Sequence, residues 1–405
     1  MSLATPPSLE ERLQADPYSG RPTRILQVIS SLDVGGAEKR LLDITRHVDR
    51  NRVELHFCTF SSQAGELSNE FRAAGARFHV VPMGLRFSYQ FKQLLRQHQF
   101  DAVHAHMHNA AGYVLRLAAQ TGTAVRIAHF RSCQDGKKSS LRRRMQIRLL
   151  RHWIDKHATH VLACGRNAMM SNWGPRWEED SRFRIVYNGI DPSLFSGPRD
   201  REGISQEFNL SPDSPLYIHV GNIRRPKNHL KLLSIFARVV EHTPTANLLL
   251  VGRGDHEMER DLQFFAAKHG ISERIVFAGL RNDVPRLLLA ADAMIFPSLW
   301  EGLPGAVLEA CAAGIPVLAS DIPEISEIAE RLPLVHCLPL VREDQEWARM
   351  AISLSQQSSE IQNTTAAARA FDASPFHIRA CVASLYEVWE HAVSGRGWNL
   401  SNRAA

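Results

Sequence analysis

Short apolar runs and amphipathic stretches alternate through the first half of the chain. The apolar runs are short enough for buried strands, and they cover residues 24–30, 53–60, 77–82, 101–108, 124–130, 159–164 and 183–186. Apolar residues at helical spacing follow most of them, at 39–47, 67–74, 88–98, 110–120 and 140–157. This alternation of strand and helix predicts an α/β domain with a doubly wound sheet.

The second half repeats the pattern after an interruption. Residues 191–215 are rich in Pro, Ser, Asp and Gly and show little periodicity, which predicts an interdomain linker, placed at 196–215. Strands are expected at 216–220, 248–251, 275–278, 291–296 and 316–319. Helices are expected at 230–242, 258–269, 284–290, 306–313 and 378–393. The last helix is amphipathic and must pack on one of two domains, 23–195 or 216–375.

Composition narrows the class of protein. A chain of 405 residues with 44% apolar and 22% charged residues fits two globular domains. Residues 1–22 are polar, which predicts a flexible tail rather than a signal peptide. The six cysteines form no C-x-x-C pair, and we therefore expect reduced thiols in a cytoplasmic protein.

Positive charge is concentrated in one segment. The net charge is +6, and much of the excess lies in Lys137, Lys138, Arg142, Arg143, Arg144, Arg148 and Arg151. Such a segment is either a solvated helix face or a surface for nucleic acid, anionic lipid or an anionic substrate. It lacks interleaved aromatic residues, which argues against nucleic acid.

The stretch 296–309, FPSLWEGLPGAVLE, predicts a strand, a turn and a helix N-terminus. Gly302, Pro304 and Gly305 form the turn, and a helix N-terminus attracts anions. Glu301 and Glu309 flank it. Carboxylates that accept hydrogen bonds from sugar hydroxyls, beside a helix end that binds phosphate, would make a nucleotide-sugar site. The alternative is two solvated glutamates with ordinary turn glycines.

A second turn, residues 221–228, follows another strand of the same predicted domain. It holds Gly221 and three cations, Arg224, Arg225 and Lys227. Such a turn could clamp a diphosphate, or it could be an exposed basic turn. Because both turns follow strands of one sheet, we expect them to face the same crevice.

The first domain carries glycines and histidines at predicted strand ends. Gly35 and Gly36 follow the first strand without the G-x-G-x-x-G spacing of a nicotinamide dinucleotide fold. His104, His106 and His108 would share one face of an extended segment, and His129 ends the next strand. A metal site is one interpretation of the first three. Polar lining of a ligand crevice is the other.

Taken together, these motifs resemble glycosyltransferase family 4, whose members are retaining enzymes of the GT-B fold. The resemblance rests on E-G-L-P-G-A-V-L-E at 301–309, G-G-A-E at 35–38, V-Y-N-G-I-D at 186–191, H-V-G at 219–221 with K-N at 227–228, and F-A-G-L-R-N-D-V at 277–284. The segments at 126–129 and 135–137, with the basic helix, are similar to a branch that assembles exopolysaccharide and cell-surface glycans.

The resemblance implies two Rossmann-like domains facing across a cleft, with the helix at 376–395 completing the first. It implies that Glu309 holds the ribose and that Glu301 contacts the donor sugar. Lys227, with Arg224 or Arg225, would neutralise the diphosphate, and His129 would lie by the reacting sugar, with His104 and His106 on the acceptor side. The remaining donor-binding residues it implies are Gly35, Gly36, Gly221, Gly279, Arg281, Gly302, Leu303, Pro304, Gly305 and Val307.

One position departs from the family, since Asn222 stands where an arginine is usual. No D-x-D occurs, so neither a metal nor another cofactor is expected. The resemblance favours a UDP-sugar donor, a glycan or lipid-linked acceptor, and a peripheral location on the inner face of the cytoplasmic membrane through residues 137–151. The alternatives are a GT-B-fold nucleotide-sugar epimerase and a non-catalytic basic binding protein.

Overall fold

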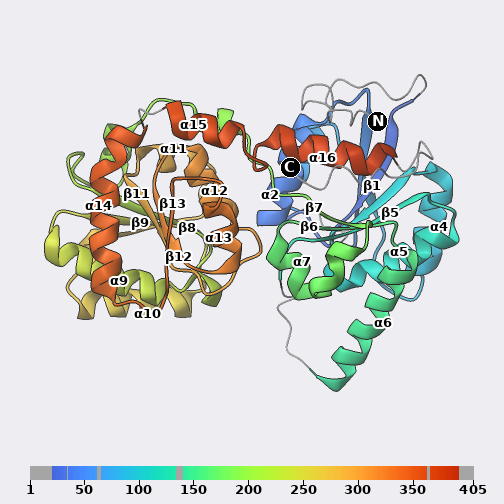
Figure 1. Ribbon diagram of the computed structural model, residues 1–405, viewed down its shortest axis with the longest axis horizontal. Coiled ribbons are helices and arrows are strands. Elements are labelled where there is room, and N and C mark those ends of the chain that lie inside the picture. The colour runs from blue at the N-terminus through green and yellow to red at the C-terminus, as the bar shows by residue number, and fades with distance from the viewer. Residues whose placement is uncertain (1–20, 34, 62–64, 134–139, 363–364, 392–405) are drawn as a thin grey trace, which may run out of the picture. The chain divides into compact units, whose positions relative to one another are not determined.

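The structure is a computed structural model, which describes residues 21–33, 35–61, 65–133, 140–362 and 365–391 (Figure 1). The chain divides into two compact units, Met1–Gly189 with Ile378–Ala405, and Ile190–His377. Most of the expected tail, and the cations Lys137 and Lys138, lie outside the described residues.

The first unit is built on a seven-stranded parallel sheet with the order β3-β2-β1-β4-β5-β6-β7. Its strands are β1 (Thr23–Val28), β2 (Val53–Thr59), β3 (Arg77–Val80), β4 (Ala102–Ala105), β5 (Val125–Phe130), β6 (His160–Ala163) and β7 (Phe183–Ile185). Its helices are α2 (Gly36–His47), α3 (Ser68–Ala73), α4 (Phe87–His98), α5 (Ala111–Gln120), α6 (Leu141–His157), α7 (Arg166–Trp173) and α16 (Ile378–His391). The five central strands are largely buried because helices cover both faces of the sheet, whereas the edge strands β3 and β7 have no buried residue.

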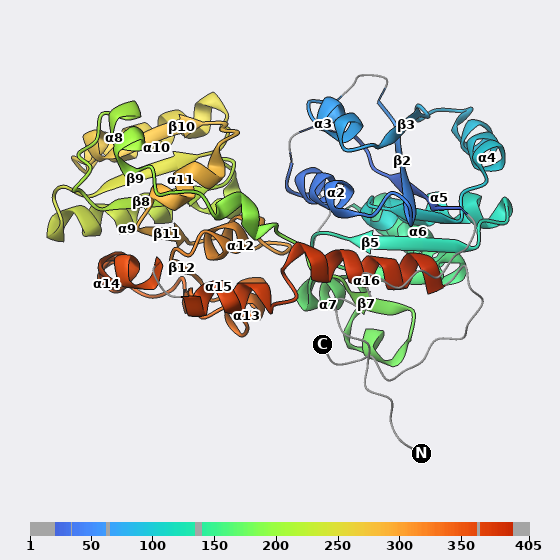
Figure 2. The same ribbon diagram turned by 90° about the horizontal axis from the view of Figure 1, so that it is seen from above.

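Helix α16 belongs to the first unit although residues 190–377 separate it from the rest. It lies beside α2, from the start of the chain (Figures 1 and 2). Its apolar face, Val382, Leu385, Val388 and Trp389, joins the core around Ile25 and Phe57. Arg52 and Glu390, both about one-tenth exposed, form an ion pair of 2.7 Å that fixes the end of the helix.

Helices α5 and α6 approach very closely at Gly112. A Cβ atom at this position would lie 2.1 Å from the carbonyl oxygen of Leu150, so the contact requires glycine. Leu150 and Ile154 are the buried residues of α6, and its other faces are largely exposed. The amino-terminal half of α6 extends beyond the rest of its unit (Figure 1).

The second unit has a six-stranded parallel sheet with the order β10-β9-β8-β11-β12-β13. The strands are β8 (Leu216–Val220), β9 (Asn247–Val251), β10 (Ile275–Gly279), β11 (Ala293–Phe296), β12 (Val317–Ser320) and β13 (Val335–Leu338). The helices are α8 (Arg201–Glu207), α9 (His229–His242), α10 (His256–Lys268), α11 (Val284–Ala290), α12 (Gly305–Ala312), α13 (Pro323–Ala329), α14 (Asp344–Gln362) and α15 (Thr365–Asp372). Helix α14 lies against α9 (Figure 1), and its Trp347 is fully buried in the core.

The segment 196–215, expected as an interdomain linker, contains helix α8 and groups with the second unit. Asp200 caps the helix by accepting a hydrogen bond from the Gly203 amide. Ile204 is fully buried, and Glu207 forms ion pairs of 2.7 Å with Arg281 and Arg286. A single buried apolar residue gives too weak a period to mark a helix in the sequence.

In each sheet, successive strands are added first on one side of the first strand and then on the other. The first strand of each, β1 and β8, has the second strand on one side and the fourth, β4 or β11, on the other. Ligands of open α/β sheets bind at such a switch point, beyond the carboxyl ends of the strands. Each unit therefore has one preferred place for a site.

Candidate active site

At the switch point of the second unit, two loops are joined by hydrogen bonds and an ion pair. One follows β8 and the other follows β11. The Leu299 amide donates to the Pro226 carbonyl oxygen over 2.7 Å, and the Asn228 side-chain amide donates to the Pro297 carbonyl oxygen over 3.1 Å. Lys227 and Glu301 close the junction, because Nζ donates to Oε1 over 2.7 Å. The side chains are 19% and 12% exposed, so the charges are partly desolvated.

Helix α12 starts at this junction. Pro304 is its N-cap and supplies no side-chain cap, so the first amides, from Gly305 to Val307, donate no hydrogen bond to an N-cap side chain. Gly302 is half-buried and Leu303 is buried in the turn before it. Glu309 lies one turn into the helix and is half-buried. The helix end and Lys227 thus offer positive charge within a site bordered by two carboxylates.

Arg224 and Arg225 lie on the same loop and are exposed. The Arg225 guanidinium lies 5.9 Å from the centroid of the Trp300 ring. Asn222, which replaces the usual arginine, accepts a hydrogen bond from the Arg253 amide over 2.9 Å. Asn222, which stands where a cationic side chain is usual, therefore links the β8 loop to the β9 loop.

The segment with Gly279 and Arg281, expected to bind the donor, makes contacts within the protein. Gly279 ends β10, and its carbonyl oxygen accepts from the Gly252 amide over 2.9 Å. The Arg281 side chain forms ion pairs of 2.7 Å with Glu207 and Asp283. These carboxylates raise the pKa of Arg281, and the hydrogen bonds that Arg281 donates to Asp283 are the largest cause. We therefore expect only the backbone of this segment to meet a ligand.

At the switch point of the first unit, three of the predicted histidines come together. His104 on β4 and His129 on β5 are joined by a hydrogen bond of 3.1 Å, and their rings stack. The ring of His106 lies 4.2 Å from that of His104 and 5.3 Å from that of His129. His108 begins a short 3-10 helix and packs on Phe130, so the prediction that it shares their face is wrong.

The protonation of His129 follows from its neighbours. The Trp389 indole can only donate, and its Nε1 lies 3.2 Å from His104 Nδ1. His104 must therefore donate through Nε2 to His129 Nδ1, which leaves the His129 proton on Nε2. That nitrogen is buried and has no hydrogen-bond partner among the described residues. Because a buried donor without a partner is costly, a ligand oxygen there would be stabilising.

His106 is held by a different pair. Arg131 Nε donates to its Nδ1 over 3.1 Å, and its Nε2 donates to Gln27 Oε1 over 2.7 Å. Burial keeps the pKa of His104, His106 and His129 well below the ordinary value, and the Arg131 charge lowers it further. A metal ion is disfavoured at this place. The Arg131 guanidinium contacts the cluster, and both ring nitrogens of His104 and of His106 are hydrogen-bonded within the protein.

Gly35 and Gly36 lie at the N-terminus of α2, as expected for a ligand loop. Glu38 occupies this helix end, since a Cβ atom on Gly35 would lie 2.3 Å from its Oε2. Burial raises the pKa of Glu38, although its own backbone amide and the Arg131 charge act to lower it. A phosphate could reach this helix end only if the Glu38 carboxyl moved aside.

Several residues around the sites were not predicted. Arg131, Gln27 and Trp389 position the first cluster, and His219 and His229 lie buried beneath Lys227. His219 Nδ1 donates to the Ile295 carbonyl oxygen, and its Nε2 has no partner among the described residues. Gln27, Arg131 and His219 lie in or just after predicted strands, and Trp389 lies on the amphipathic last helix, but none of these positions marks a residue as part of a site.

Comparison with known families decides the class of this protein. The family described as Glycosyltransferase Family 4 matches residues 34–194, and the family described as Glycosyl transferases group 1 matches residues 200–332. The two matches are consecutive and each covers the site of one unit. The chain is a family 4 glycosyltransferase.

Individual relatives agree with this assignment. EpsF of Bacillus subtilis, whose name describes a glycosyltransferase, is 28% identical over 86% of this chain and 93% of its own length. The capsular polysaccharide biosynthesis glycosyltransferase CapH of Staphylococcus aureus is 28% identical over 75% of this chain and 83% of its own. Anabaena Alr3699/HepE, solved with UDP and glucose, has a TM-score of 0.74 at 20% identity, covering 92% of this chain and 99% of its own. The glycosyltransferase therefore has the GT-B fold.

Among the described residues of this glycosyltransferase, no helix is long and apolar enough to span a membrane. The expectation of a metal-independent reaction remains a prediction.

Proposed function

We propose that this glycosyltransferase transfers a sugar, with retention, from a UDP-sugar to a glycan or lipid-linked glycan during assembly of an exopolysaccharide or envelope polysaccharide. One observation carries the donor half of the proposal. The Lys227–Glu301 ion pair joins two loops at the switch point, directly before the uncapped N-terminus of α12. Partly desolvated positive charge at this place suits a diphosphate.

The transfer reaction requires positive charge beside the diphosphate. When the bond from the sugar to the diphosphate breaks, negative charge develops on the β-phosphate. Lys227 and the first amides of α12 would stabilise this charge as it forms, with Arg224 or Arg225 reaching the outer oxygens. Glu301 would hold a donor-sugar hydroxyl, and Glu309 would accept hydrogen bonds from the ribose.

His129 would act as a donor rather than as a base. The Trp389–His104–His129 relay places its proton on Nε2, and its depressed pKa keeps the ring neutral. We propose that this N–H binds a hydroxyl of the sugar substrate. His104 and His106, on the acceptor side by resemblance, would then position His129 and its surroundings without contacting substrate.

Similar proteins support the choice of donor and process. HepE has been solved with UDP and with UDP-glucose, and CapH is named for capsular polysaccharide biosynthesis. The loops after β8 and β11 leave the sheet at its switch point, where doubly wound folds bind ligands, and this supports the proposed donor site.

The donor can be identified by thermal unfolding with UDP, GDP and their sugars. A ligand at 100 times its dissociation constant should stabilise the protein by about 2.7 kcal/mol. We expect UDP-sugars to do so, and Glu309→Ala to lose most of the effect. The exposed Glu241→Ala, on α9, serves as the control. Stabilisation by no nucleotide, or equal stabilisation of Glu309→Ala, would contradict the proposed site.

The acceptor would be reached at an anionic membrane surface through helix α6. Leu141, Met145 and Leu149 are 77%, 69% and 49% exposed, and their spacing of four residues places them along one side of the helix. Arg142, Arg144 and Arg148 are exposed between them. An apolar stripe flanked by arginines is typical of helices that lie in the interface of an anionic bilayer.

Sedimentation with phosphatidylglycerol vesicles tests this surface. We expect binding at low salt that weakens as salt is raised, and little binding to phosphatidylcholine vesicles. Met145→Ser with Leu149→Ser should abolish binding, whereas Phe264→Ser should not. Phe264 is a matched control because it is 74% exposed on α10, in the second unit. Equal binding by both variants would rule out α6 as the contact.

A further inference from the structure

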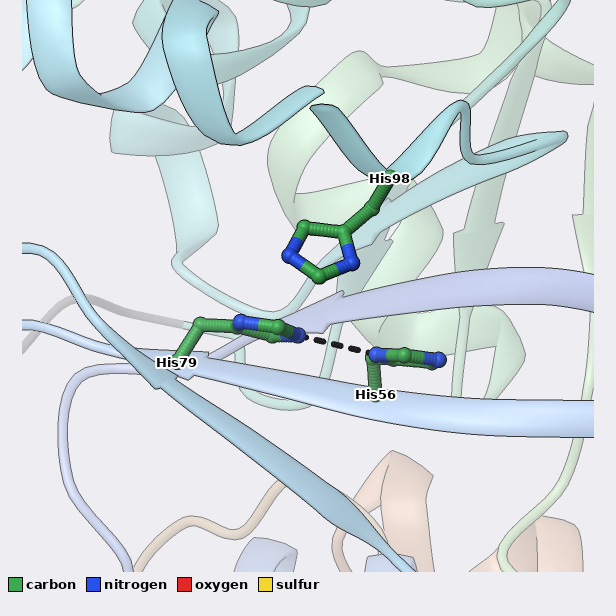
Figure 3. Close-up of side chains that lie close together, drawn as sticks. All are labelled: His56, His79 and His98. Carbon is green, nitrogen blue, oxygen red and sulfur yellow. Dashed lines mark hydrogen bonds between the residues drawn. The ribbon is translucent and has the colours of Figure 1, made fainter. Parts of the chain in front are cut away.

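Three histidines that the glycosyltransferase reaction does not use meet at the edge of the first sheet. His56 lies on β2, His79 on the edge strand β3, and His98 is the last residue of α4 (Figure 3). His56 is buried, and the other two are half-buried. The cluster therefore has one protected side and a route to solvent.

The sheet register brings the first two rings together. Cys58 is paired with His79, so His56, two residues earlier on β2, points to the same face as His79. Their rings are nearly parallel, and His56 Nδ1 and His79 Nε2 are hydrogen-bonded over 2.8 Å, so one of these nitrogens carries a proton that a bound metal ion would displace. The His98 ring centroid is 4.5 Å from that of His79 (Figure 3). One ligand nitrogen from each residue lies within 4.8 Å of the other two.

A carboxylate lies beside the cluster and favours a bound cation. Glu54 Oε1 is 3.3 Å from Nε2 of His56, the nitrogen that does not face His79. Arg24 and Arg77 hold Glu54 at 3.1 and 2.8 Å.

We propose that His56, His79 and His98 bind one divalent transition-metal cation of the zinc class. Three imidazoles and a water complete a tetrahedral shell, and imidazole is a preferred ligand of such ions. For both nitrogens to bind one ion, the 2.8 Å hydrogen bond between His56 and His79 must break and their separation must widen to roughly 3.3 Å, to fit bonds of about 2.0 Å. The bound ion would connect the four-residue edge strand β3 to β2 and α4. Because the site exists only in the folded state, the ion would raise the free energy of unfolding.

Titration of the tag-free, full-length protein with Co²⁺ tests the site, because tetrahedral cobalt absorbs strongly in the visible range. We expect one Co²⁺ per chain, displaced by Zn²⁺, and a higher melting temperature with either ion. His79→Asn and His98→Asn should each weaken binding by at least about tenfold. His256→Asn, outside both histidine clusters, should bind as the original chain does, and so should His106→Asn from the other cluster.

Failure of the original chain to bind Co²⁺ or Zn²⁺ would overturn the proposal. The three histidines would then be aromatic rings that pack on Phe100. Survival of the cobalt spectrum in the His79→Asn, His98→Asn double variant would also overturn it. Circular dichroism of each variant separates loss of ligands from loss of folding. If the Asn variants unfold, His98→Gln, at the half-buried helix end, provides the same test.

Discussion

At the scale of single residues, the Lys227–Glu301 pair has the sharpest consequence. Lys227→Gln removes the cation that would receive charge from the breaking bond, so we expect kcat to fall by about 10²- to 10³-fold. Steady-state kinetics with the identified UDP-sugar measures the loss. Lys231→Gln is the control, since Lys231 is a nearby lysine of α9 whose Nζ lies 2.6 Å from Asp344.

The same variant leaves Glu301 without its partner, close to the expected diphosphate. We therefore expect the double variant Lys227→Gln, Glu301→Gln to bind UDP more tightly than Lys227→Gln alone, although neither should be active. Calorimetric titration with UDP compares them. Tighter binding by the single variant would mean that Glu301 does not face the phosphates.

His229 gives a pH dependence of stability. It is 4% exposed, and burial, with a smaller effect of the Lys227 charge, lowers its pKa to about 4. Since the unfolded chain has the higher pKa, about 6.5, acid favours unfolding. The stability that His229 contributes is fully present above pH 6.5 and is lost as the pH falls towards 4, up to about 3 kcal/mol in all.

Urea unfolding at pH 4.5 to 7 measures this contribution. His229→Gln should reduce the loss of stability between pH 6.5 and 4, whereas the exposed His269→Gln should leave the profile unchanged. An unchanged profile in His229→Gln would show that His229 takes up no extra proton on unfolding.

At the scale of secondary-structure elements, the close approach of α5 and α6 depends on Gly112. A methyl group there would press on the Leu150 carbonyl, so Gly112→Ala should destabilise the first unit by about 1–3 kcal/mol. It should also weaken vesicle binding, because it displaces α6. Gly84→Ala is the control, since a Cβ atom at that position meets no atom within 4 Å.

The elements near the sites were largely predictable, because each begins or ends at a distinctive turn. The strand before Glu301, the cationic loop with Lys227 and the basic helix were all expected from local patterns and are confirmed as structural elements. Helices α7, α13, α14 and α15 and strand β13 were not predicted. No distinctive turn or candidate site residue drew attention to these segments.

What local patterns could not reveal is which elements meet. The contact between Lys227 and Glu301 depends on β8 lying beside β11, and strand order is a property of the whole sheet. The protonation of His129 depends on Trp389, which lies far along the chain. Such contacts are set by tertiary packing, and a single sequence carries no direct signal for them.

At the scale of the whole molecule, the two units have separate hydrophobic cores, each containing a fully buried tryptophan, Trp389 in the first and Trp347 in the second. Replacing a buried tryptophan by alanine typically costs about 3–5 kcal/mol. In scanning calorimetry, Trp389→Ala should lower one unfolding transition and Trp347→Ala the other. UDP should raise only the transition that Trp347→Ala lowers. A single transition shifted equally by both variants would contradict separate units.

The position of α16 also orders events during synthesis. A ribosome releases residues 190–377 before it makes the helix that fills the core of the first unit and donates to His104. The usual sequence, in which the amino-terminal domain folds first, is therefore reversed at its last step. Until translation has passed Trp389, the apolar residues that α16 covers stay exposed in the first unit. A chain stalled before that point would also lack the hydrogen bond to His104, and chaperones would meet this incomplete unit.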